Sequence, residues 1–379
     1  MFELTRFLND LITNHAWLCL ILAFVLGAIV GSYLNVCIYR LPLDKSLFWP
    51  GSRCGSCLQK IRFYPDNIPL VSYWLLGGKC RTCGTSYSSR YFWIELLTAS
   101  AFAGLFYLEV VENVHNIGAL RQNRVALPAP WQFLLVWLYH CALVSLLIVA
   151  TFTDVDHWTI PIAVTIPGTI LGIIGGALGP WPWPMDVGRI SQIDPGWMSL
   201  PYGGFGLSPG DFAPLPAGMQ RWPVFMPLPD WLPPGTWQLG LATSVVGAAV
   251  GALGMRLIRI IFSWGLRKEA MGLGDADLMM MIGAFLGWQA LVLVLVYSVL
   301  LGLVYAIVLL VRNAGHELPF GPFLAGGAIL ALIVPWFYIT SQNLFFDLQL
   351  VLVLGGVSAV LALCLTIAIR MVRLITDAT

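Results

Sequence analysis

Two short stretches of the sequence place carboxylates against otherwise apolar residues. The stretch "TDVDHWTIP", residues 153–161, carries Asp154 and Asp156, and "MGLGDADLMMMIGAF", residues 271–285, carries Asp275 and Asp277. Ionisable side chains at membrane depth are costly and usually functional. Two carboxylates held close together share one proton, so that the ionised one activates water while the protonated one polarises a scissile carbonyl. The two stretches therefore suggest an aspartyl protease dyad.

A structural interpretation competes at each aspartate. An Asp near a helix N-terminus caps the helix and meets the positive end of its dipole, and we prefer this interpretation for Asp277. It is weaker for Asp154, which is expected at the C-terminal end of a long apolar helix, where the dipole disfavours an anion. The glycines of "GLGD" allow close backbone approach at Asp275. No Ser, Cys or "HExxH" arrangement competes, and His157 is the only histidine near these carboxylates.

A second chemical pattern is formed by four of the eight cysteines. "CGSC" supplies Cys54 and Cys57, and "CRTC" supplies Cys80 and Cys83, with 22 residues between the pairs. Two such turns complete a tetrahedral zinc site that leaves no open position, so the metal would be structural. Two disulfides are the alternative, but a reducing cytoplasm would argue against them. The remaining cysteines lie in apolar runs and are interpreted as packing residues: Cys19, Cys37, Cys141 and Cys364.

The composition predicts an all-α polytopic membrane protein. The chain of 379 residues is 58% hydrophobic and 10% charged, with a mean hydropathy of +0.81, whereas soluble domains are about 25% charged. About eight apolar runs approach the roughly 20 residues that span a bilayer: 17–39, 93–111, 131–153, 160–179, 237–262, 289–311, 320–340 and 349–373. The shorter piece 276–288 is either a half-span or the first part of one long kinked helix. The first run lacks a basic n-region and a cleavage site, which favours a retained helix.

The distribution of Lys and Arg predicts the orientation of these helices. Segment 40–90 carries eight such residues and 256–268 carries four, whereas 112–130 carries two. The first two segments are therefore expected in the cytoplasm and the N-terminus outside. Counting helices from this anchor brings "TDVDHWTIP" and "GLGDAD" to the same, cytoplasmic face of the membrane.

Five segments follow from this pattern. Residues 1–42 hold the first transmembrane helix, and the polar, basic 43–91 reads as a small cytoplasmic zinc-binding domain. Residues 92–179 are expected to hold transmembrane helices with Asp154, the first candidate catalytic Asp, and 237–379 those with the "GLGD" stretch. Between them, 180–236 contains 13 of the 24 prolines, a composition that blocks regular structure, and we expect an extracytoplasmic insert.

Several motifs, in order, resemble the type IV prepilin peptidase family, the bifunctional leader peptidases and N-methyltransferases of pilus and type II secretion systems. "GSYLNVCIYRLP" at 31–42 is similar to the family's GSFLNVVIYRLP, and the CxxC pairs agree together with their flanking "NIP" and "RY…E-L" residues. "TDVDHWTIP" matches IDxDxxxxP, "GLGD" at 272–275 matches GxGD, and "PFGPFLA" at 319–325 matches PFGP. The resemblance covers most of the chain outside 180–236.

The resemblance implies roles for particular residues. Asp154 and Asp275 would form the catalytic pair, Asp156 would support them, and Cys54, Cys57, Cys80 and Cys83 would bind zinc. The implied enzyme cleaves the basic leader of prepilins or pseudopilins at the cytoplasmic face of the bacterial inner membrane. It then methylates the new N-terminus with S-adenosylmethionine. The expected partners are these substrates and membrane lipid, without nucleic acid.

Three departures from the family pattern stand out. The family often has Asp where this chain has Ile162, and usually has Lys where it has Asp277; the third departure is the long insert. Residues that would bind the methyl donor cannot be read from the sequence. The alternatives are a presenilin-type GxGD protease, which would lack the tetracysteine domain, and a transporter or inactive assembly protein with the aspartates as ion ligands. Transporter sites lie near the bilayer midplane, whereas both aspartates map to one face.

Overall fold

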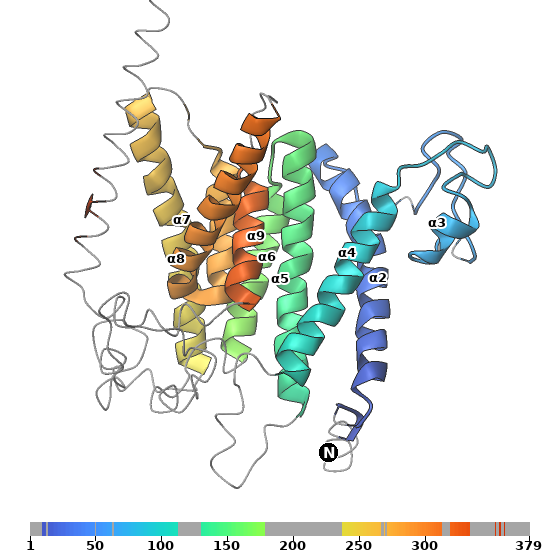
Figure 1. Cartoon of the computed structure of the whole chain (residues 1–379), viewed down its shortest axis with the longest axis horizontal. Helices are drawn as coiled ribbons and strands as arrows, with labels where there is room; N and C mark the ends of the chain where they lie inside the picture. Colours follow the sequence, from blue (N-terminus) through green and yellow to red (C-terminus); the bar gives the residue numbers. More distant parts are fainter. Residues whose placement is uncertain are drawn as a thin grey trace, which may run out of the picture. The chain divides into compact units, whose positions relative to one another are not determined.

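The computed structural model of the chain describes residues 10–12, 14–49, 51–62, 64–112, 130–178, 237–266, 269, 271–312 and 319–333, with the separate positions 353, 356, 357 and 360. Within these residues, every secondary-structure element longer than an isolated bridge is a helix (Figure 1). Two isolated antiparallel bridges, Arg53–Lys60 and Lys79–Ser86, are the strand-like features of the same residues. The prediction of an all-α protein is confirmed.

The helices follow the predicted apolar runs closely. In chain order they are α2 (Ala16–Arg40), η1 (Leu41–Leu43), α3 (Val71–Leu75), α4 (Arg90–Leu105), the π-helix η2 (Phe106–Val111), α5 (Pro130–His157), α6 (Ile162–Leu178), α7 (Trp237–Leu266), α8 (Leu273–Val311) and α9 (Gly321–Ile333). Five of the described helical stretches are long and apolar enough to cross a membrane, and α6 and α9 are shorter apolar helices. The chain is thus a multi-pass membrane protein, although the predicted number of eight spans is not reached among the described residues. The run 349–373 and the insert 180–236 fall outside the helices described.

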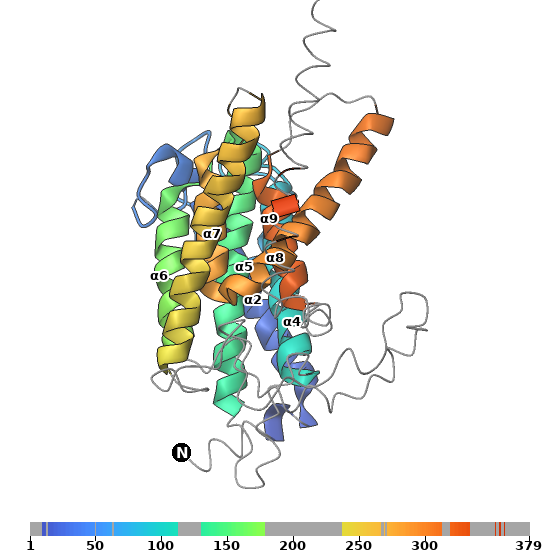
Figure 2. The ribbon, with the colours of Figure 1, turned by 90° about the vertical axis from the view of Figure 1, so that its left-hand side faces the viewer.

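Helix α8 includes residues 276–288, for which the sequence left two interpretations. They form the first part of one long helix, which is interrupted at Gly287 by a non-helical backbone with φ 77° and ψ 166°. A positive φ of this kind is open to glycine and costly for other residues. The second half of α8 leans away from the first half (Figure 2), so residues 276–288 are helical and are separated from the following span by a break at Gly287.

The chain divides into two compact units, each described by itself. The first unit comprises residues 1–118, 123–165 and 317–325, and the second comprises 119–122, 166–316 and 326–379. The first unit therefore holds α2 to α5 with the cysteine-bearing segment and the first residues of α6 and α9. The second holds α7, α8 and the remainder of α6 and α9.

In the first unit, α2 and α4 approach closely through glycines. Gly27 and Gly31 form a GxxxG motif, "GAIVG", and a Cβ at Gly27 would lie 2.7 Å from the Cα of Ala99. Small residues four apart let transmembrane helices bring their backbones together. The contact continues toward the end of α2, where the Asn35 side chain donates a hydrogen bond to the Tyr91 carbonyl at 3.1 Å.

Helix α5 packs on α4 and η2 through buried polar side chains. The Trp137 indole N–H donates to the Phe102 carbonyl at 3.0 Å, and its ring meets Phe102 and Phe106 edge-on. Three residues farther along α5, His140 Nδ1 lies 2.6 Å from Glu109 Oε1, with both side chains nearly inaccessible. These contacts satisfy polar groups that would be expensive to leave unpaired in hydrocarbon.

In the second unit, α7 and α8 also approach closely through glycines. Gly247 and Gly251 form a second GxxxG motif, "GAAVG". A Cβ at Gly247 would overlap the carbonyl of Gly283 on α8, and a Cβ at Gly251 would overlap the carbonyl of Met279. Because backbone atoms cannot move aside as a flexible side chain can, these glycines set the distance between the helices.

We expect Gly251→Ala to destabilise the protein, because the added methyl would meet the Met279 backbone. Overpacking of this kind costs about 1–3 kcal/mol, and the effect would appear as a lower unfolding temperature in detergent. Gly254→Ala on the same helix is the matched control, since a Cβ there meets nothing within 4 Å. Equal unfolding temperatures for the two variants would contradict the close approach of α7 and α8.

Candidate active site

Asp154 lies in the last turn of α5, one turn before the helix ends at His157. The helix is closed by Trp158, whose backbone has a φ of 57° and whose N–H donates to the Asp154 carbonyl at 2.8 Å. The predicted helix end was therefore a few residues early, although Asp154 still belongs to the C-terminal end. Its residue surface is 7% exposed, so its carboxylate is held away from bulk water.

The Asp154 carboxylate meets the start of α9 within the first unit. Oδ2 accepts a hydrogen bond from the Gly321 backbone N–H at 3.1 Å. Gly321 is the glycine of the "PFGP" segment, which resembles a family motif and for which no role was predicted. Two motifs 167 residues apart thus meet at one carboxylate.

Asp156 is bound differently, by a cation. The Arg90 guanidinium lies 2.7 Å from its carboxylate and also stands 4.9 Å from the centre of the Phe152 ring. Arg90 opens α4, so the ion pair ties the start of α4 to the end of α5. The carboxylate of Asp156 is therefore largely occupied by a structural contact.

Asp275 lies in the first turn of α8, as predicted, and its residue surface is 8% exposed. Asp277, two residues later, lies 3.7 Å from the Arg256 guanidinium of α7. The structural interpretation preferred for Asp277 is supported, with an ion pair in addition to the helix dipole. The family usually has a lysine at the position of Asp277. In this chain, Arg256 of the neighbouring helix α7 brings a positive charge close to that position.

The structure brings Asp154 together with Gly321, and Asp156 with Arg90, in the first unit; it brings Asp277 together with Arg256 in the second. Asp154 and Asp275 belong to different units, and their pairing as a dyad stays a prediction. Each offers what acid–base chemistry requires, a carboxylate that is screened from bulk water at the end of a helix.

The four predicted cysteines lie together in the first unit. Their sulfur atoms all lie within 4.8 Å of one another, with Cys54 to Cys83 at 3.7 Å and Cys57 to Cys80 at 4.0 Å. Four sulfurs bound to one zinc at about 2.3 Å would be about 3.8 Å apart, whereas a disulfide joins sulfurs at about 2.05 Å. All four thiols are free, so the alternative of two disulfides is not adopted. The cluster has the ligand set and spacing of a tetrahedral metal site.

The two CxxC turns have the same backbone plan. In each, the first cysteine donates its N–H to a carbonyl five residues later, Cys54 to Gln59 at 3.0 Å and Cys80 to Thr85 at 2.9 Å. In each, the residue after the second cysteine has a left-handed backbone, with φ 57° at Leu58 and 71° at Gly84. Such turns direct two thiols to one point. Hydrogen bonding with the hydroxyl and backbone of Thr85 lowers the pKa of Cys83 to about 6, which favours the thiolate form of this one cysteine.

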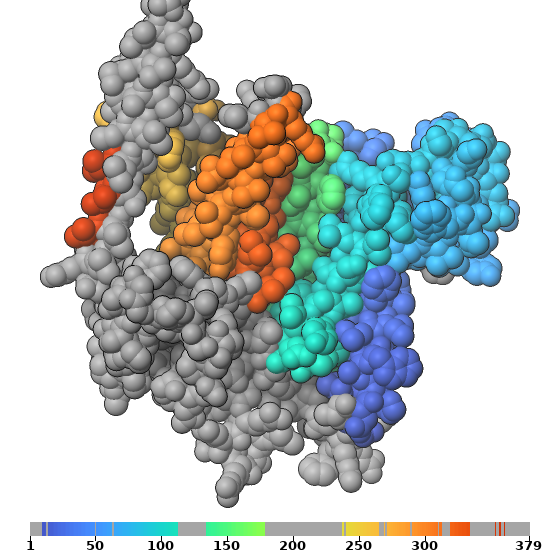
Figure 3. All heavy atoms as spheres, in the orientation of Figure 1, coloured from blue at the N-terminus to red at the C-terminus, as the bar shows by residue number. Residues whose placement is uncertain are grey.

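The cysteine-bearing segment forms a lobe beside α2 and α4 (Figure 3) and is joined to α4 by Glu95. The Glu95 carboxylate accepts a hydrogen bond from the Leu70 N–H at 2.7 Å, directly after the "NIP" residues. Ser72 fastens the same loop by donating to the Pro65 carbonyl at 2.9 Å. Glu95 of the "RY…E-L" stretch thus binds the residue that directly follows "NIP".

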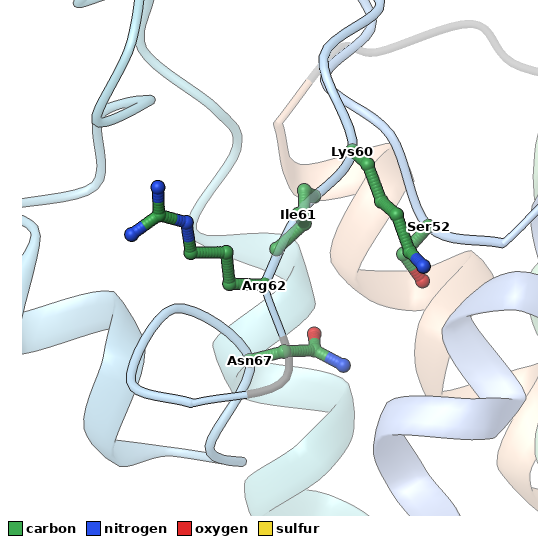
Figure 4. A pocket seen from close by; sticks show the side chains of 5 residues that line it. All are labelled: Ser52, Lys60, Ile61, Arg62 and Asn67. Atoms are coloured by element: carbon green, nitrogen blue, oxygen red, sulfur yellow. The ribbon is translucent and has the colours of Figure 1, made fainter.

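An open hollow of about 580 Å³ on the same lobe is lined by Ser52, Lys60, Ile61, Arg62 and Asn67. The side chains of Lys60 and Arg62 point to different sides of it (Figure 4). They do not converge on one position, and the lining includes no carboxylate. We assign this hollow no ligand.

Sequence reasoning identified the aspartates and cysteines but missed Arg90, Arg256, Glu95 and Gly321. Three of these lie in motifs that the sequence analysis had quoted, so the motif match was the available signal. Their partners could not be read from it, because each contact depends on which faces of two helices or loops meet.

Two family models match the chain. The bacterial Peptidase A24 N-terminal domain matches residues 25–108, which include the four cysteines, and the type IV leader peptidase family matches residues 231–307, which include Asp275. No solved structure matches the chain.

Curated relatives extend the match over most of the sequence. Prepilin leader peptidase/N-methyltransferase of Myxococcus xanthus (strain DK1622) is 32% identical over 76% of this chain and 63% of its own length. The proteins of the same name from Pseudomonas putida and Neisseria gonorrhoeae are 29% and 30% identical, over 82% and 80% of this chain and 89% and 86% of their own lengths. The chain therefore spans less than two thirds of the Myxococcus relative and most of the other two. Given these matches, the chain belongs to the prepilin leader peptidase/N-methyltransferase family, the type IV leader peptidases.

Proposed function

We propose that the chain is a membrane aspartyl endopeptidase that removes the leader peptide of type IV prepilins or type II secretion pseudopilins and then methylates the new N-terminus. The observation that carries the proposal is the shared name of its relatives, prepilin leader peptidase/N-methyltransferase. The chain keeps both aspartate motifs and the tetracysteine cluster of the family it belongs to.

Asp154 and Asp275 are proposed as the catalytic pair. Two neighbours with the same chemistry are already engaged by guanidinium groups, Asp156 by Arg90 and Asp277 by Arg256. The buried carboxylates, 7% and 8% exposed, are the better acid–base candidates. The ionised member would take a proton from water as it attacks the scissile carbonyl, and the protonated member would donate to the carbonyl oxygen. Proton return to the leaving amine completes hydrolysis without a covalent intermediate.

The tetracysteine cluster is proposed to hold structural zinc. Its four sulfurs fit a tetrahedral site with no open ligand position, so the ion would stabilise the lobe and take no part in hydrolysis. A lobe of fewer than 50 residues builds little hydrophobic core, and the metal would therefore contribute much of its folding free energy.

The methyl donor is proposed to be S-adenosylmethionine, which supplies an electrophilic methyl group. The hollow on the tetracysteine lobe is lined by the cationic side chains of Lys60 and Arg62, which point to different sides, and by no carboxylate. It therefore does not fit the positively charged sulfonium of the donor or its ribose hydroxyls. We therefore derive no methyl-transfer step from the described residues.

The enzyme is proposed to lie in the bacterial inner membrane with its active site toward the cytoplasm. The basic segments 40–90 and 256–268 support this orientation. Asp154 precedes the short turn between α5 and α6, and Asp275 opens α8 after the link from α7. One outward helix and one returning helix would carry both to the same face. The five segments 1–42, 43–91, 92–179, 180–236 and 237–379 are proposed on the same grounds.

The helix-end positions also argue against a transporter. Coupling-ion sites of transporters lie near the bilayer midplane, at broken helices, whereas Asp154 lies in the last turn of α5 and Asp275 in the first turn of α8. An aqueous membrane face is where a water-dependent hydrolysis would be carried out.

Single Asn substitutions test the pair. Asp154→Asn and Asp275→Asn keep size and polarity but remove the titrating proton, and each should lower prepilin cleavage in membranes by at least about 10²-fold. Asp44→Asn makes the same chemical change at an exposed position with a left-handed backbone that Asn tolerates, and should cleave like the wild type. Full cleavage by either of the first two variants would remove that residue from the pair.

Metal analysis tests the cluster. The purified chain should contain about one zinc, and Cys54→Ser with Cys80→Ser should abolish it and expose the lobe to trypsin, because two lost thiolates leave the ion without a closed site. Cys141→Ala, at a cysteine outside the cluster, should keep full zinc content. Zinc retained by the double variant would show that the metal is bound elsewhere.

A further inference from the structure

Helix α9 begins without a side-chain cap of its own. The residue before it is Phe320, which has no polar side chain, and its second residue is Pro322, which has no N–H. The N–H groups of Phe323 and Leu324 bond back to the Phe320 carbonyl at 3.0 and 3.1 Å. The first N–H groups of a helix have no acceptor in a preceding turn. In the first turn of α9, the Gly321 N–H is the donor that still needs an acceptor from elsewhere.

Asp154 supplies the missing acceptor. Its Oδ2 receives the Gly321 N–H at 3.1 Å, and both residues are buried. A carboxylate at the start of a helix also meets the positive end of the helix dipole. The cap of α9 is therefore contributed by a different helix, α5, in a part of the chain where little water is available to replace it.

The glycine is required by space rather than by backbone conformation. Gly321 is not among the residues with positive φ, so alanine could adopt its backbone. An added Cβ, however, would lie 2.5 Å from Asp154 Oδ2, 3.1 Å from its Cγ and 3.2 Å from Ile160 Cδ1. Any side chain at this position would push the carboxylate away from its donor.

We propose that Gly321 is a positioning residue for Asp154: its N–H fixes Oδ2, and its lack of a side chain leaves the carboxylate room to lie against the start of α9. With Oδ2 held, the direction in which Oδ1 faces is set as well. This inference rests on the proposed function, because it concerns one of the two aspartates that would act in hydrolysis. It gives the "PFGP" segment a role in peptide cleavage that involves no contact with the substrate.

The predicted kinetic effect follows from the geometry. Displacing a reacting group by about 1 Å costs about 10²-fold in rate, and a group that acts on the reacting bond alone alters kcat and leaves KM unchanged. Gly321→Ala should therefore lower kcat for prepilin cleavage by about 10²-fold with little change in KM. Gly104→Ala is the control in the same unit, because a Cβ there meets nothing within 4 Å, and it should leave both constants unchanged.

A stability cycle tests the contact without any substrate. Gly321→Ala should lower the unfolding temperature in the wild-type background, but much less in an Asp154→Ala background, where the clashing oxygens are gone. Additive shifts would overturn the contact, and an unchanged kcat for Gly321→Ala would overturn the positioning role. If the wild type cleaves no prepilin, the proposed function is wrong, and the positioning role in cleavage falls with it. If the wild type is active but the two substitutions shift the unfolding temperature additively, only the inference about Gly321 is wrong.

Discussion

A carboxylate placed beside hydrocarbon must recover the hydrogen bonds it loses with water, and this requirement governs the surroundings of the aspartates. Leaving such a group without donors costs several kcal/mol. The chain meets the cost at helix ends, where free N–H groups are available, and with guanidinium groups from neighbouring helices. Asp154 uses the start of α9, Asp156 uses Arg90, and Asp277 uses Arg256. A helix end or a neighbouring guanidinium thus supplies the hydrogen bonds that a carboxylate in this membrane protein would otherwise make with water.

One of these contacts, Arg256 to Asp277, also depends on how closely two helices approach. Gly27 and Gly31 let α2 lie against α4, and Gly247 and Gly251 let α7 lie against α8. Lipid tails are as apolar as leucine, so helix association in a bilayer depends on packing and polar contacts more than on the hydrophobic effect. Arg256 reaches Asp277 across the α7–α8 interface that these glycines define. Small residues therefore matter here through the polar groups that they allow to meet.

The sequence predicted the parts whose signals are local. Hydrophobic run length located α2, α4, α5, α7 and α8, and CxxC spacing located the four clustered cysteines to the residue. It placed the end of α5 a few residues early, because the polar Asp154 and Asp156 still belong to the helix. It did not predict the Gly321–Asp154 or Arg90–Asp156 contacts, since these depend on the rotation of helices far apart in sequence. The motifs "GAIVG" and "GAAVG" were available signals of close helix approach that the hydropathy pattern did not use.

Contacts within the first unit link the cysteine cluster to the end of α5 that carries Asp154. The cluster holds together a lobe whose loop at Leu70 is bound by Glu95 of α4. Five residues before Glu95, the same helix presents Arg90 to Asp156, which lies two residues from Asp154. A change in the lobe would therefore act first on the register between α4 and α5. The cysteine cluster and Asp154 need not share atoms to depend on one another, because the contacts that lead from each of them meet on α4.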